Sequence, residues 1–453
     1  MNETPQAYRP DPRILELGDA VYDVVEAANF PETRLRFRND RAADEVGLAA
    51  LSDAEWTRHF GRFAPLPDNL PRPLALRYHG HQFRSYNPDI GDGRGFLFAQ
   101  MRDHGGRLMD LGTKGSGQTP WSRFGDGRLT LKGGVREVLA TEMLEALGVG
   151  TSRSFSLIET GEALERNDEP SPTRSAVLVR LSHSHIRIGT FQRLAYLRDD
   201  ETMTRLIGYV LRNLYGEEPG DEPATRLLDL VVRRTARLAA SYMAAGFVHG
   251  VLNTDNINVT GESFDYGPWR FLPTWDPAFT AAYFDHAGLY AFGRQPEAIH
   301  WNAMQLAVSL RTVSEAAPLI AVLETFGDHY QTAVSEAILW RLGLVPRGAE
   351  EDAALVGAVE RGLRAEMLPV DRFFFDAFAG HLPDGDAFAE ARARVAPYAA
   401  RKARDHLYWR DDTPCAMVIG EVEAIWSAIA DRDDWSLFAS KITAIREMGA
   451  ALA

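Results

Sequence analysis

The spacing of apolar residues changes once along this chain of 453 residues. Between about residues 96 and 181, short apolar runs such as Phe155–Ile158 are bounded by Gly, Asp and Ser, which is typical of strands. One helix interrupts them, because the apolar positions of Val135–Leu144 form a single stripe. Beyond Gly189 the period becomes helical, most clearly in Leu227–Ala245. This order predicts an α+β protein in which a small strand-rich lobe precedes a larger helical lobe.

Charge and composition exclude several classes of protein. The 49 basic and 63 acidic side chains leave a net charge of −14, whereas proteins that bind nucleic acids usually present a basic surface. We therefore expect no nucleic acid as a partner. No run of about 18 apolar residues is present, so we expect no membrane as a partner either. Cys415 is the only cysteine, which excludes an internal disulfide and fits a reducing compartment. The acidic N-terminus resembles no targeting peptide, so a cytoplasmic protein is expected.

The loop His249–Asn256 and the segment Phe264–Gly267 carry the polar residues most suited to chemistry. Asn256 and Asp265 offer two hard oxygen ligands, which suit one Mg²⁺ that keeps its other positions for phosphate and water. Asp255 is the carboxylate left in the loop to contact an incoming hydroxyl. The alternative is a helix-to-strand loop in which Asn and Asp only form turns.

Protein kinases contain a similar pair of segments. Their H-R-D-L-x-x-x-N loop provides an Asp that orients the accepting hydroxyl and an Asn that binds Mg²⁺, and a D-F-G segment provides a second Mg²⁺ ligand. When Asn256 is aligned with the kinase Asn, Val251 stands at the position of the kinase Asp. Valine cannot accept a proton. Either the chain is catalytically inactive, or the neighbouring carboxylate of Asp255 contacts the accepting hydroxyl in a reaction that takes place at a shifted position.

Two glycine-rich turns in the strand-rich lobe are candidates for phosphate binding. In Gly91-Asp92-Gly93-Arg94-Gly95 the glycines allow backbone N–H groups to approach an anion, and the arginine adds positive charge. The segment Gly125-Asp126-Gly127-Arg128 repeats this chemistry, which suggests that both ends of a polyphosphate are held. Taken alone, the first segment is explained more simply as an ordinary hairpin turn.

Two pairs of charged residues add to this picture. Lys114 lies on or beside a strand and Glu137 lies on the helix that follows, a separation that allows an ion pair to present the ammonium to phosphate oxygens. Arg180 and Arg187 flank Ser182–His185, and a guanidinium binds phosphate better than an ammonium does. Unrelated surface charges are the alternative for the first pair, and solvated arginines at a strand edge for the second.

Taken together, these segments resemble the selenoprotein O family, protein adenylylyltransferases (AMPylases) built on a protein-kinase-like fold. The resemblance extends in register over roughly residues 60–310, which makes it far more specific than a single glycine loop. It is carried by Tyr78–Phe83, Asn87–Arg94, Ser122–Arg128, Arg136–Glu137, Ser184–Arg187, His249–Asn256 and Asp265–Pro268.

The resemblance implies that ATP is bound in the reverse orientation to that in kinases, so that AMP is transferred to Ser, Thr or Tyr hydroxyls of proteins. Asp255 then matches the catalytic base. Asn256 and Asp265 match the ligands of Mg²⁺ or Mn²⁺, and Asp265 also contacts ATP. The other implied contacts with ATP fall on Gly91, Gly93, Arg94, Lys114, Asp126, Gly127, Glu137, Arg180 and Arg187.

A bilobal protein-kinase-like fold is also implied. Residues 1–75 would form an N-terminal extension, residues 76–190 the nucleotide-binding N-lobe, and residues 191–453 a helical C-lobe with extra C-terminal helices. Two rival interpretations stay open. One is a kinase-type phosphotransferase, against which Val251 argues. The other is a non-catalytic nucleotide-binding pseudokinase scaffold, which would not need Asp255 beside a metal site.

The sequence departs from the family in its cysteines and its tail. Family members often carry one cysteine in the activation-type segment and another near the C-terminus, and bacterial members can link the two. Here the corresponding segments are Tyr283–His286 and Ala451–Ala453. We therefore expect the redox switch to be absent. The tail around Asp412–Cys415 also differs from the usual family C-terminus.

Overall fold

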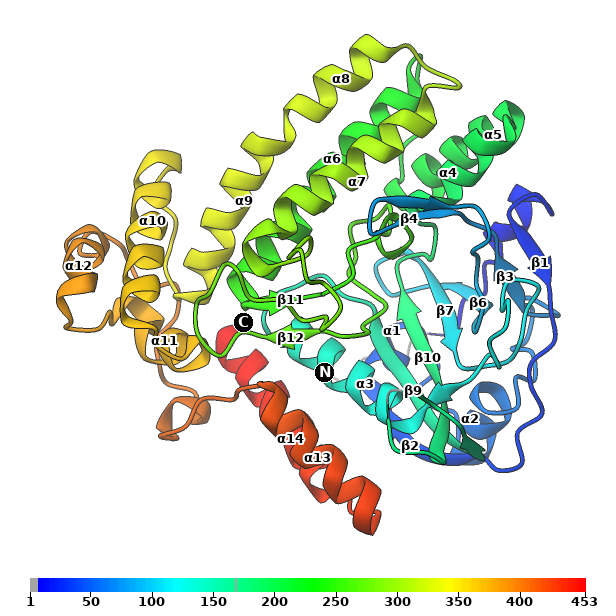
Figure 1. The fold of residues 1–453 in the computed structure, drawn as a ribbon, viewed down its shortest axis with the longest axis horizontal. Coiled ribbons are helices and arrows are strands. Elements are labelled where there is room, and N and C mark those ends of the chain that lie inside the picture. Colours follow the sequence, from blue (N-terminus) through cyan, green and yellow to red (C-terminus); the bar gives the residue numbers. More distant parts are fainter. Residues whose placement is uncertain (1–6, 168) are drawn as a thin grey trace.

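A computed structural model provides the structure of residues 7–167 and 169–453, so the first six residues of the 1–75 segment lie outside the described residues. The fold is α+β, with an antiparallel sheet beside a large group of helices (Figure 1). Within the described ranges, no helix is both long enough and apolar enough to cross a membrane.

The main sheet contains strands from the first 182 residues. Its strands are Tyr22–Val24 (β1), Arg34–Arg38 (β2), Leu74–Leu76 (β3), Leu97–Arg102 (β6), Leu108–Lys114 (β7), Leu129–Thr130 (β8), Arg153–Leu164 (β9) and Thr173–Ser182 (β10). Their order is β1-β3-β6-β7-β10-β9-β2, with β8 paired to β10. The predicted strand Phe155–Ile158 lies within β9. Strands β1 and β2 form the two edges, so residues 22–38 complete the sheet.

Two short antiparallel pairs of strands lie outside the main sheet. Strand β4 (Gly80–Gln82) pairs with β5 (Ser85–Asn87), and β11 (Phe247–Val248) pairs with β12 (Arg270–Phe271).

Helix α3 (Leu131–Ala146) packs against the sheet and confirms the helix predicted over Val135–Leu144. It begins at Thr130, whose side-chain oxygen accepts a hydrogen bond from the Gly133 N–H (3.1 Å). Its apolar stripe is buried, and it contacts both β9 and β10. This position brings Glu137 beside the end of β7.

The remaining helices follow the sheet, apart from two short ones near the N-terminus. Figure 1 shows the long helix α6 lying alongside α7 and α9. The Gly246 cap of α6 has a φ of 62°, in the left-handed region that favours glycine. The bounds are Asp40–Glu45 (α1), Asp53–Phe60 (α2), Ile188–Leu197 (α4), Asp200–Val210 (α5), Pro223–Ala245 (α6), Gln295–Leu310 (α7), Ala316–Glu324 (α8), Phe326–Arg341 (α9), Ala349–Glu366 (α10), Val370–Ala377 (α11), Ala389–Val395 (α12), Ile419–Arg432 (α13) and Ser436–Leu452 (α14).

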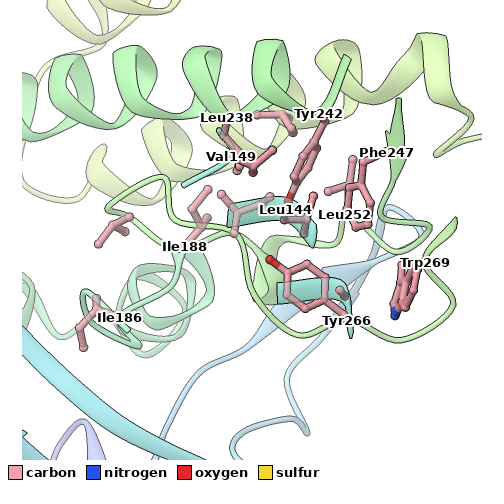
Figure 2. Packing of buried hydrophobic residues seen from close by; sticks show 14 of the residues in the cluster. Leu144, Val149, Ile186, Ile188, Leu238, Tyr242, Phe247, Leu252, Tyr266 and Trp269 are labelled. Atoms are coloured by element: carbon pink, nitrogen blue, oxygen red, sulfur yellow. The ribbon is translucent and has the colours of Figure 1, made fainter. Parts of the chain in front are cut away.

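A hydrophobic cluster joins α3 to α6 around the segment that contains Asp265 (Figure 2). Leu144 of α3, Tyr242 of α6 and Tyr266 all belong to this cluster. The hydroxyls of Tyr242 and Tyr266 both bond to Ser263 Oγ, at 2.5 and 2.7 Å. The core therefore fixes the backbone on both sides of Asp265.

Candidate active site

A cavity of about 700 Å³ lies between the main sheet, the two glycine-rich turns and the loop after α6. All the site residues proposed from the sequence line this cavity except Glu137 and Asn256. Tyr78, Trp121 and Arg123 also line it, and no individual role was predicted for them from the sequence.

Lys114 connects three parts of the cavity wall. It is the last residue of β7 and is 5% exposed, and its ammonium donates to Glu137 Oε1 on α3 and to Asp265 Oδ1 (2.6 Å). Arg180 on β10 lies 3.4 Å from the same Asp265 oxygen. Burial by itself raises the pKa of Asp265, but the charges of Lys114, Arg180 and Arg94 outweigh it and hold the pKa well below its ordinary value. Asp265 is therefore an ionised carboxylate.

Asp255 is a buried carboxyl group with a free oxygen. It lies in the short helical turn Thr254–Asn256 and is 8% exposed, and its Oδ1 has no hydrogen-bond partner among the described residues. Burial raises the pKa of Asp255 to about 6, although the charge of Arg187 opposes this. A Cβ atom at Gly80 would lie 2.8 Å from Asp255 Oδ1, so glycine is required on this side.

Arg187 holds two parts of the site together. It is 4% exposed, and it donates to the backbone carbonyl of Asp255 (3.1 Å) and to Asp92 Oδ1 (3.3 Å). Its guanidinium also lies over the ring of Tyr78, at 4.1 Å from the centroid. The first glycine-rich turn is thereby tied to the loop that carries Asp255.

The glycines of the first turn have a packing role that the sequence did not reveal. A Cβ atom at Gly91 would lie 2.5 Å from the indole ring of Trp121, and one at Gly93 would lie 2.8 Å from the Trp121 carbonyl oxygen. The indole N–H donates to Asp23 Oδ2 (2.9 Å). Trp121 therefore packs the second glycine-rich segment onto the first. In that second segment, Asp126 forms an ion pair with Arg166 (2.8 Å).

The hairpin of β4 and β5 is bonded to the loop after α6. The N–H of His81 donates to Thr254 Oγ1 (2.7 Å), and the N–H of Phe83 donates to Asn253 Oδ1 (3.0 Å). Thr254 Oγ1 in turn donates to Gln192 Oε1 on α4 (2.6 Å). This role of the hairpin could not be predicted from the sequence, because these contacts join residues 173 and 170 positions apart.

The donor atoms at Asn256 and Asp265 fit a hard divalent cation. Asn256 Nδ2 donates to the carbonyl of Val251 (2.9 Å), which leaves the amide oxygen as the atom able to bind a metal. Asp265 adds an ionised oxygen. In residues 7–167 and 169–453, no group of three or more His, Cys, Asp or Glu side chains could hold a metal ion. The oxygen atoms of Asn256 and Asp265 are of the kind that Mg²⁺ accepts.

Comparison with known proteins identifies the family. A family model described as "Protein adenylyltransferase SelO" matches residues 6–384. This chain belongs to the SelO family. Its curated relatives include proteins named "Protein nucleotidyltransferase YdiU". The one from Gloeobacter violaceus is 45% identical over 96% of this chain and 95% of its own length, and the one from Synechococcus elongatus is 53% identical over 74% and 68%. The SelO match ends before α13 and α14.

Proposed function

We propose that this SelO-family protein transfers AMP from ATP to Ser, Thr or Tyr hydroxyls of other proteins and releases pyrophosphate. One observation carries the proposal beyond the family name. The free, buried Oδ1 of Asp255 lines the same cavity as the Lys114–Asp265 ion pair. A proton acceptor and a phosphate-binding charge are therefore present in one site.

In this proposal, Asp255 Oδ1 accepts the proton of the attacking hydroxyl. The hydroxyl oxygen forms a bond to the α-phosphorus while the bond to the pyrophosphate oxygen breaks, and the leaving group takes the electron pair. Lys114, Arg180 and Arg187 offset the negative charge that develops on the phosphates. Because burial raises the pKa of Asp255 to about 6, it is a stronger base than an ordinary carboxylate.

We further propose that Asn256 and Asp265 hold Mg²⁺ or Mn²⁺. Such a cation, when bound, neutralises charge on the phosphates of ATP. Lys114 would then keep Asp265 ionised and oriented for this role, since it donates to Oδ1 at 2.6 Å. Glu137 positions the ammonium of Lys114 from the side of α3.

The proposed function goes with a two-lobed, kinase-like arrangement. Residues 76–190 would be the nucleotide-binding lobe and residues 191–453 the helical lobe, with residues 1–75 as an extension. The sheet and α3 on one side of the cavity and α6 with its loop on the other support a boundary near residue 190, whereas β1 and β2 of the first segment belong to the same sheet as the nucleotide-binding lobe. We place the protein in the cytoplasm, which its single cysteine supports.

The rival functions are less well supported by the geometry. A kinase base at position 251 would need a side chain that accepts a proton, and the Val251 carbonyl only accepts a bond from Asn256. A scaffold that binds a nucleotide without turnover would gain nothing from a buried carboxyl oxygen without a partner, because such an atom costs stability.

The test uses ATP labelled separately at the α- and γ-phosphorus. With Mg²⁺ or Mn²⁺ present, the α label should become covalently attached to protein acceptors, and the γ label should appear in pyrophosphate. Transfer of the γ label alone would replace the proposal with a kinase. Nucleotide binding without transfer of either label, across several acceptor proteins, would favour the scaffold.

A further inference from the structure

A second cavity, of about 530 Å³, adjoins the first one beyond Lys114 and Glu137. The proposed AMP transfer gives it no role. Its walls come from the first half of α3, from the residues after Asp265, from the segment containing Tyr283 and Phe284, and from Glu423 on α13. Arg94 and Arg128 of the glycine-rich turns also line it, together with Arg166 and Glu169.

Arg136 and Arg270 lie side by side in the wall of this cavity. Arg136 Nη2 donates to the carbonyls of Gly267 and Trp269, both at 3.2 Å. Arg270 Nη1 donates to the carbonyls of Pro268 (2.9 Å) and Trp269 (2.8 Å). Among the described residues, neither guanidinium has a carboxylate within ion-pair distance. Burial and the charge of Arg270 lower the pKa of Arg136 to about 10, although the charges of Glu423 and Glu137 oppose this, so the guanidinium is protonated at neutral pH and has no direct carboxylate contact among the described residues.

Apart from Arg94, which also lines the first cavity, the other cations around this cavity are paired with carboxylates. Lys132 is bonded to Glu423 at 2.7 Å, Arg128 to Glu162 at 2.8 Å, and Arg166 to Asp126 at 2.8 Å. The two arginines are also held in place, since they share the Trp269 carbonyl and Arg136 lies over the Trp269 ring, 4.7 Å from its centroid. A fixed pair of guanidinium groups is well suited to a carboxylate.

We propose that Arg136 and Arg270 bind an acidic side chain of the protein that receives AMP, so that acceptors with Asp or Glu near the target hydroxyl are preferred. The inference rests on the proposed function and specifies its substrate class. Two observations favour the acceptor over the nucleotide as the source of the anion.

The first observation is the rim of the cavity, where Tyr283 and Phe284 are 83% and 44% exposed. Exposed aromatic side chains beside a charged pocket are typical of surfaces that bind other proteins. The second is that Lys114 lines both this cavity and the first one, which also contains the free oxygen of Asp255. An acceptor bound here would therefore lie next to the proposed reacting centre.

The experiment uses three peptides that share one tyrosine and differ only in whether Glu, Gln or Lys residues flank it. The wild-type protein should bind the Glu peptide and transfer AMP to it with a KM about tenfold below that for the Gln peptide. The substitution Arg270→Glu should reverse the preference in favour of the Lys peptide. Arg237→Gln, at an exposed position of α6, serves as the control and should leave the preference unchanged.

Peptide binding is also measured without ATP, by fluorescence titration, so that the docking site and the transferase activity are tested separately. Equal binding of the three peptides by the wild-type protein would overturn the docking site, as would an Arg270→Glu variant that keeps the preference for Glu. A variant whose KM for ATP rises while its peptide preference stays the same would assign the two arginines to the nucleotide. Charge-selective binding without transfer of the α label would leave the docking site standing and reject the proposed function.

Discussion

Asp255 is the residue on which the proposed chemistry depends most directly. The substitution Asp255→Asn keeps the size of the side chain but removes its ability to accept a proton, so AMP transfer should fall by about 10²–10⁴. The affinity for ATP should stay within a few-fold. By contrast, Asp265→Ala removes one of the two anionic partners of Lys114 and an expected metal ligand, so both ATP binding and transfer should weaken. Calorimetric ATP titration beside a transfer assay measures the difference. Near wild-type transfer by Asp255→Asn would mean that another group is the base.

Glu262 provides a test of the pH dependence of stability. Burial raises its pKa from 4.5 to about 7, although the His183 N–H donates to its carboxylate (2.8 Å). The folded protein therefore holds this proton more tightly than the unfolded chain does. The resulting contribution to stability is complete below about pH 4.5 and is lost as the pH rises through about 7.

The substitution Glu262→Gln imitates the protonated carboxyl. We expect it to match the wild-type protein near pH 5 and to be more stable by roughly 1–2 kcal/mol at about pH 8.5, as measured by denaturant unfolding. Glu336→Gln, at an exposed position of α9, is the control and should show no such dependence. A stability difference that is the same at both pH values would show that Glu262 is already ionised in the acidic range.

At the scale of elements, the last two helices support the helix that carries Glu137. Figure 1 shows α13 and α14 near α3, and both helices contact it. Arg446 of α14 donates to both carboxylate oxygens of Glu142 on α3, each at 2.8 Å, and this carboxylate is buried. Lys132 of α3 is bonded to Glu423 of α13. The position of α3 thus depends on a segment beyond the SelO match.

The substitution Arg446→Ala should destabilise the protein by about 1–3 kcal/mol, because it removes the main partner of a buried carboxylate while Arg41 remains 3.2 Å away. It should also raise the KM for ATP more than it lowers kcat, measured at a temperature where the variant is folded. Arg446→Lys should recover part of both losses, and Arg432→Ala at the exposed end of α13 is the control. A loss of stability with an unchanged KM would limit these helices to a structural role.

At the scale of the whole molecule, the single cysteine predicts an activity that does not respond to mild oxidation. Cys415 is partly buried, and burial raises the pKa of its thiol to about 11, so little reactive thiolate is present at neutral pH. AMP transfer should be the same in reducing and in mildly oxidising buffer at low protein concentration. A large, reversible activation by dithiothreitol would show that an intermolecular disulfide regulates the protein.

Short-range features of the fold could be predicted from the sequence. The helices around Val135–Leu144 and Leu227–Ala245 were correct in position, because their apolar period and their flanking glycines are local signals. The pairing of Lys114 with Glu137 was also anticipated, because the two residues lie on a strand and on the next helix of the chain, although residues 115–130 separate the two elements.

Other features required the tertiary structure. Gly80 must be glycine because Asp255 approaches it from another part of the chain, and Gly91 must be glycine because of Trp121. That Arg136 is bonded to carbonyls and has no ion-pair partner among the described residues became visible only when its neighbours were known. By itself, the sequence determined the residue types, the local elements and the family resemblance. The tertiary structure decided which charges are neutralised and which oxygen is left free, because burial and pairing depend on residues far apart in the chain.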